Sequence, residues 1–109
     1  MNKSYAQKVI EAVRGIPHDA KQAAKACLWE FPESDFAAYQ AMPDVPRLKS
    51  YSRYLAVIAA MQADLEGKGV RVVRVKIPVA TMLAGLEKHH WPNDTEHRAG
   101  VTGELGATL

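Results

Sequence analysis

The segment from Gly69 to Val79, GVRVVRVKIPV, is the feature that most constrains the fold of this chain. β-Branched residues dominate it, and Pro78 marks its end because proline has no N–H to give to a strand ladder. All other segments have the periodicity of helices. A single strand leaves main-chain N–H and C=O groups in need of partners, so the sequence predicts that something pairs with this strand.

Elsewhere, apolar residues recur at three- and four-residue steps, which is typical of amphipathic helices. In the longest such segment, residues 48–65, the steps predict that Leu55 lies at the centre of the core. The six segments predicted as helices are residues 3–14, 20–31, 33–42, 48–65, 79–86 and 94–105. The predicted fold is therefore mainly α, of the α+β class, with about six helices and one short strand.

The length of 109 residues suits one domain, residues 1–109, with a helical part at 1–66 and a strand-helix-helix part at 70–109. The chain has no long apolar run, and its first residues do not resemble an export signal. A single cysteine, Cys27, cannot form an intramolecular disulfide. We therefore expect a soluble cytoplasmic protein with no membrane segment.

Three partners for the strand are open from the sequence. They are a second strand at residues 26–31 (ACLWEF), the same strand of another copy, or no strand at all if the segment is an extended linker. Residues 26–31 lie inside the predicted helix 20–31, which weighs against the first. Pairing across a homodimer needs only two-fold symmetry, the commonest symmetry of oligomers, and is the arrangement we expect.

Residues 70–109 resemble the ribbon-helix-helix DNA-binding proteins. The strand ending Arg74-Val75-Lys76-Ile77-Pro78, followed by two helices, matches the pattern of that family. The resemblance implies a dimer whose paired strands enter the major groove of double-stranded DNA. Strand alternation places Val72, Arg74 and Lys76 on one face, which would contact DNA, and Val73, Val75 and Ile77 on the other. The alternative is that the cations form the solvated side of an edge strand.

A helical protein-interaction module with no role in nucleic-acid binding is the second functional hypothesis. Its contact patch would be the aromatic residues Trp29, Phe36 and Tyr39, because aromatic side chains are enriched at binding hot spots. The opposing interpretation places Trp29 in the core, where large aromatic residues contribute most.

The segment HHWPNDTEH contains imidazoles and carboxylates that could hold a zinc ion if the turn brought them together. Its candidate ligands are His89, His90, Asp94, Glu96 and His97. The spacing matches no standard zinc pattern, so an exposed polar turn is the favoured interpretation.

The sequence contains few signals of a catalytic site. Cys27 lies in an apolar stripe, which favours an inert thiol, and the sequence has no glycine-rich phosphate loop before a helix. We therefore expect a protein that is not an enzyme and that has no cofactor.

Overall fold

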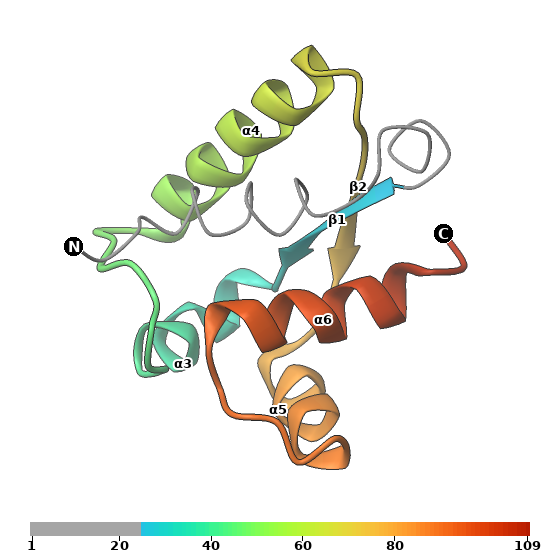
Figure 1. Ribbon diagram of the computed structural model, residues 1–109. Coiled ribbons are helices and arrows are strands. Elements are labelled where there is room, and N and C mark those ends of the chain that lie inside the picture. Colours follow the sequence, from blue (N-terminus) through green and yellow to red (C-terminus); the bar gives the residue numbers. More distant parts are fainter. Residues whose placement is uncertain (1–24) are drawn as a thin grey trace, which may run out of the picture.

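The computed structural model describes residues 25–109 (Figure 1). The elements in chain order are β1 (Lys25–Glu30), the 3-10 turn η1 (Glu33–Asp35), α3 (Phe36–Gln40), α4 (Tyr51–Gly67), β2 (Arg71–Lys76), α5 (Val79–Lys88) and α6 (Thr95–Gly106). The helix expected at residues 3–14 and the first part of the helix expected at residues 20–31 lie outside the described residues.

The two strands form a parallel sheet in which Lys25 is opposite Arg71 and Glu30 is opposite Lys76. The prediction of about six helices and one strand is therefore wrong, because residues 25–109 contain four α-helices and two paired strands. Residues 26–30, which were predicted to be helical, belong to β1 instead. A short apolar run is compatible with the periodicity of a helix and with that of a strand. Here hydrogen bonding to β2 favours the strand. β2 thus has its partner within the same chain, and the argument that required a second copy no longer holds.

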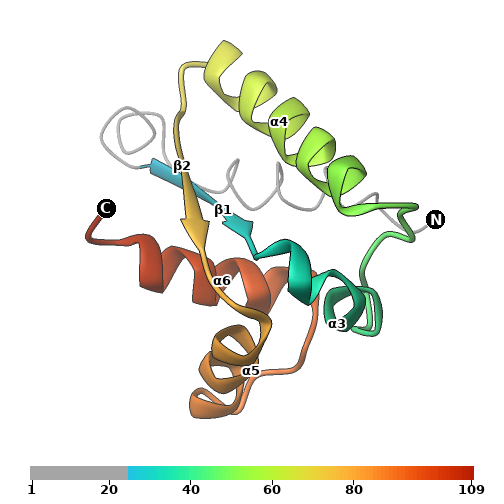
Figure 2. The ribbon, with the colours of Figure 1, turned by 180° about the vertical axis from the view of Figure 1, so that it is seen from behind.

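Each face of the sheet is covered by a helix, as expected for parallel strands (Figures 1 and 2). On one face, Arg74 of β2 donates a hydrogen bond to Gln62 of α4. On the opposite face, a Cβ atom at Gly106 of α6 would lie 2.7 Å from both Cys27 Sγ and Val75 Cγ2. The sheet is therefore the middle layer between α4 and α6.

The core is rich in aromatic side chains from β1, α3 and α4. The ring of Phe31 lies 4.6 Å from that of Tyr39 and 4.4 Å from that of Tyr54. The buried residues of α4 are Tyr54, Ile58, Met61 and Leu65. Leu55, which the sequence placed at the centre, is only partly buried. The sequence predicted the helix, but the face that is buried in the structure is displaced by about one residue from the face that was predicted.

Local signals set the ends of several elements. The Ser50 hydroxyl accepts a hydrogen bond from the Arg53 N–H and caps α4, and Asp94 caps α6 in the same way through the His97 N–H. Gly69 has φ +82°, the left-handed conformation expected where the chain leaves α4 for β2. None of the helices within residues 25–109 has the length and apolar character needed to cross a membrane.

Candidate functional site

The two outer edges of the sheet differ in how their main-chain groups are occupied. The Ile77 N–H donates to the Glu30 carbonyl at 2.9 Å, so the odd-numbered residues of β2 direct their main-chain groups towards β1. Successive residues of a strand direct these groups to opposite edges. Val72, Arg74 and Lys76 therefore present their N–H and C=O groups at the outer edge of β2, where no other described strand lies.

The outer edge of β1 is capped by two tyrosine hydroxyls of α4. Tyr54 donates a hydrogen bond to the Trp29 carbonyl at 2.5 Å, and Tyr51 donates one to the Phe31 carbonyl at 2.5 Å. Burial, and then the negative charges of Glu30 and Glu33, raise the pKa of Tyr51, so its hydroxyl stays a neutral donor. Within the described part of the chain, the edge of β2 has no such caps.

A groove of about 490 Å³ follows the open edge of β2. Residues 74–77 form one wall, Thr81 of α5 lies at one end, and Leu105 and Leu109 lie on the side of α6. The two leucines are 44% and 57% exposed. The groove therefore places apolar surface beside main-chain groups of a strand, which is the arrangement used for binding an extended peptide.

A second hollow, of about 440 Å³, lies where both strands end. It is lined by Glu30, Phe31, Pro32, Tyr51, Lys76, Ile77 and Pro78. Lys76 and Ile77 line this hollow as well as the groove beside β2. The hollow and the groove therefore adjoin at the end of β2. In sheets of parallel strands, ligands bind outside the carboxyl ends of the strands, and this hollow has that position.

The two cations on the outer part of β2 have different surroundings. Arg74 donates to Gln62 Oε1 at 2.8 Å, and its guanidinium lies 3.4 Å from Glu30 Oε1. Lys76 is exposed, and its ammonium group has no ion pair with any side chain among residues 25–109. Lys76 is therefore the cation that is available to an anionic partner.

The residues predicted to contact DNA share a face, but α4 lies over that face. Arg74 is in contact with Gln62 of α4, and Val72 is half-buried. The strand that carries them belongs to a parallel sheet within one chain. Lys76, at the end of β2, is the only one of these three residues that is exposed.

The aromatic patch predicted for a protein partner is not exposed. Trp29 and Tyr39 are 4% and 0% exposed, and Phe36 is partly buried beside Tyr51. Trp29 donates its indole N–H to the Ile77 carbonyl at 2.8 Å. Trp29 therefore lies in the core, as the opposing interpretation held, and the contact surface stays a prediction of which two of the three residues are buried.

Two histidines near the α5–α6 turn, His89 and His97, are paired with carboxylates, and the rings of both lie beside Trp91. His89 Nε2 lies 2.6 Å from Glu104 Oε2, and its ring stacks on Trp91 at 4.1 Å. His97 Nδ1 lies 2.7 Å from Asp94 Oδ1. Residues 25–109 contain no group of three or more potential ligands with the geometry of a metal site.

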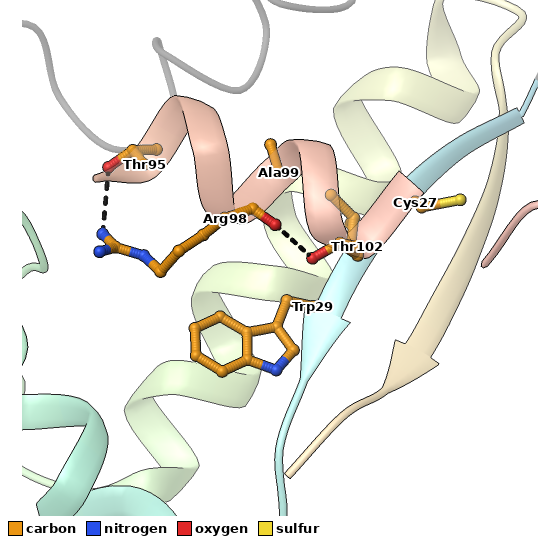
Figure 3. A pocket seen from close by; sticks show the side chains of 7 residues that line it. Cys27, Trp29, Thr95, Arg98, Ala99 and Thr102 are labelled. Atoms are coloured by element: carbon orange, nitrogen blue, oxygen red, sulfur yellow. Dashed lines mark hydrogen bonds between the residues drawn. The ribbon is translucent and has the colours of Figure 1, made fainter. Parts of the chain in front are cut away.

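A small seam between β1 and α6 contains Cys27, Trp29 and Arg98 (Figure 3). The Thr102 hydroxyl donates to the Arg98 carbonyl at 2.8 Å, which fixes one wall of the seam. Its volume of about 20 Å³ suits a single water molecule. Burial raises the pKa of Cys27, and the nearby charge of Lys25 offsets this only in part, so the side chain is a thiol at neutral pH. This seam belongs to the packing of α6.

Sequence reasoning missed the α6 side of the groove. The available signal was the pair of leucines in GELGATL, Leu105 and Leu109. Leu109 follows the end of α6 at Gly106, and nothing in the sequence placed either leucine next to β2. Comparisons of the chain with protein-family models, curated proteins and solved structures found no match.

Proposed function

We propose that this protein is an interaction module that binds an extended segment of another protein along the open edge of β2. The observation that carries the proposal is the difference between the two sheet edges. Hydroxyl groups of Tyr51 and Tyr54 cap carbonyls at the edge of β1, whereas Arg74 and Lys76 present theirs beside a groove. A peptide strand added to such an edge gains main-chain hydrogen bonds, and adjacent pockets select its side chains.

The same surface bears on the DNA hypothesis. A ribbon that reads DNA needs its cations free to approach the bases and phosphates. Arg74 is engaged by Glu30 and Gln62, and the groove beside it is partly apolar because of Leu105 and Leu109. These features favour a polypeptide over duplex DNA as the partner.

The test uses a labelled peptide of alternating valine and threonine, about ten residues long, because that composition favours an extended chain without adding charge. We expect saturable binding to the wild-type protein, with NMR shifts concentrated at the amides of Val72, Arg74 and Lys76. The absence of binding at millimolar peptide, or shifts confined to other elements, would contradict the proposal.

Two proline variants provide a matched pair. Val72→Pro removes an N–H that faces the open edge, so the sheet ladder is kept and peptide binding is lost. Val73→Pro removes an N–H that faces β1, so it should destabilise the fold itself, by about 3 kcal/mol. Undiminished binding by a folded Val72→Pro protein would rule out docking at this edge.

Mixed-sequence duplex DNA is measured in parallel at low salt. If duplex DNA binds with steep salt dependence and the peptide does not, the DNA hypothesis takes the place of this proposal. Sedimentation of the protein alone shows whether a second copy occupies the same edge instead.

A further inference from the structure

We infer that the segment bound at β2 alternates acidic and apolar residues, an inference that rests on the proposed function. A strand added to β2 places its successive side chains on opposite faces of the extended sheet. The two faces of β2 differ in chemistry at the groove. The pattern of the bound segment is therefore determined by what lies above and below the edge.

On the α4 face, the groove is bordered by cations. The side chains of Arg74 and Lys76 project to this face, as the hydrogen bond between Arg74 and Gln62 shows. Arg74 already has an ion pair with Glu30, whereas Lys76, although it lies opposite Glu30 in the sheet, has no ion pair within residues 25–109. An aspartate or glutamate of the bound segment on this face would pair with Lys76.

On the α6 face, the groove is bordered by leucines. The position of Gly106 against Val75 shows that α6 covers this face, and the groove is lined here by Leu105 of α6 and by Leu109, which follows the end of the helix. Both leucines are large apolar side chains that are exposed to water. A bound segment that covers them removes this apolar surface from water, which is favourable. The next residue of the bound segment, which points to this face, should therefore be apolar.

The charges at the groove therefore favour one kind of ligand, an extended peptide that contains acidic and apolar residues. A second copy of β2 would bring its own Arg74 and Lys76 towards those of the first, and like charges across an edge are unfavourable. A basic peptide is disfavoured for the same reason.

The test compares three peptides of the same length in which valine alternates with threonine, glutamate or lysine. We expect the glutamate peptide to bind about threefold to tenfold more tightly than the threonine peptide, and the lysine peptide to bind more weakly than either. The advantage of glutamate should fall as salt is raised.

Lys76→Ala should lower the affinity for the glutamate peptide by more than the affinity for the threonine peptide, so that most of the advantage of glutamate is lost. Lys68→Ala is the matched control, because Lys68 is an exposed lysine at the end of α4 that pairs with Asp64. On the apolar side, Leu109→Ser should weaken all three peptides, and Leu83→Ser, which alters an exposed leucine outside the groove, should not.

The outcomes separate the inference from the proposed function. If the threonine peptide binds at the β2 edge but glutamate gives no gain, the function stands and the acidic pattern is wrong. If a peptide with glutamates in one block and valines in another binds as tightly as the alternating one, alternation is wrong. Failure of every peptide to bind overturns both.

Discussion

Asp94 has two roles at the start of α6, as cap and as charge partner. Its side chain accepts hydrogen bonds from the main-chain N–H of His97 at 2.8 Å and from the imidazole at 2.7 Å. Burial raises the pKa of this carboxyl, but the two hydrogen bonds and the charges of His97 and Arg98 outweigh it and leave the pKa below its ordinary value. The charged form is therefore favoured in the folded state.

A depressed folded-state pKa contributes stability that is present above the unfolded pKa, about 3.9 for aspartate, and is lost as pH falls through the folded value. Asp94→Asn keeps a capping oxygen and removes the titration. We expect the urea midpoint of the variant to lie below that of the wild type at about pH 5, and the difference to shrink as the pH falls below the unfolded pKa. A difference that does not vary with pH would contradict this role of the charge.

The hydroxyl of Tyr54 is buried and donates to a carbonyl at the outer edge of β1. Tyr54→Phe leaves the Trp29 carbonyl without this donor, and we expect a loss of about 1–3 kcal/mol in the free energy of unfolding. Tyr51→Phe should cost less, because the hydrogen bond of Tyr51 is only partly buried and water can replace it. Denaturant titration measures both, and equal losses would show that burial does not distinguish the two hydroxyls.

At the scale of the element, α4 shows which part of helix prediction is secure. The three- and four-residue steps located the helix, but the same steps are compatible with neighbouring faces because the apolar surface is broad. The aromatic rings of Phe31 and Tyr39, from distant parts of the chain, select Tyr54 and Ile58 as the buried positions. That information is not local to residues 48–65.

Ile58→Ala should therefore cost about 2–5 kcal/mol, because Ile58 is 0% exposed and its removal leaves a cavity. Leu55→Ala, at the position that the sequence favoured, should cost about 1 kcal/mol. Chemical denaturation of the two variants compares them directly. A larger loss for Leu55→Ala would show that the buried face of α4 has been placed wrongly.

Two glycines of α6 have opposite surroundings. A Cβ at Gly106 would meet Cys27 and Val75 at 2.7 Å, whereas a Cβ at Gly103 meets nothing within 4 Å. Gly106→Ala should lower the free energy of unfolding by about 1–3 kcal/mol through overpacking. Gly103→Ala should raise it by about 0.5–1 kcal/mol through helix propensity. Thermal unfolding of the two variants tests this, and a stabilised Gly106→Ala protein would show that α6 can move away from the sheet.

At the scale of the whole molecule, the sequence predicted most of the separate elements but not which strands pair with each other. The strand β2 and the helices α4, α5 and α6 followed from local patterns. The strand β1 was not predicted, because KACLWE lies in a segment whose sequence has helical periodicity. Its pairing with β2 is not a local signal. The groove was beyond reach for the same reason, since its two walls come from separate elements.

Because β2 pairs with β1 of the same chain, its ladder of hydrogen bonds does not require a second copy. We expect the midpoint of thermal unfolding to stay constant over about a hundredfold range of protein concentration, since only a folding reaction coupled to association depends on concentration. A midpoint that rises with concentration would show that folding and self-association are coupled, as the original homodimer hypothesis requires.

The parallel pairing of strands distant in sequence also has a consequence for synthesis on the ribosome. Glu30 and Arg74, which contact each other across the sheet, are 44 positions apart. As the chain emerges from the exit tunnel, β1 appears first and must wait several seconds for β2, at the usual rate of about 5–20 residues per second. During that interval its apolar residues have neither a ladder nor the cover of α6, so β1 remains exposed to association with other chains until residues 71–76 emerge.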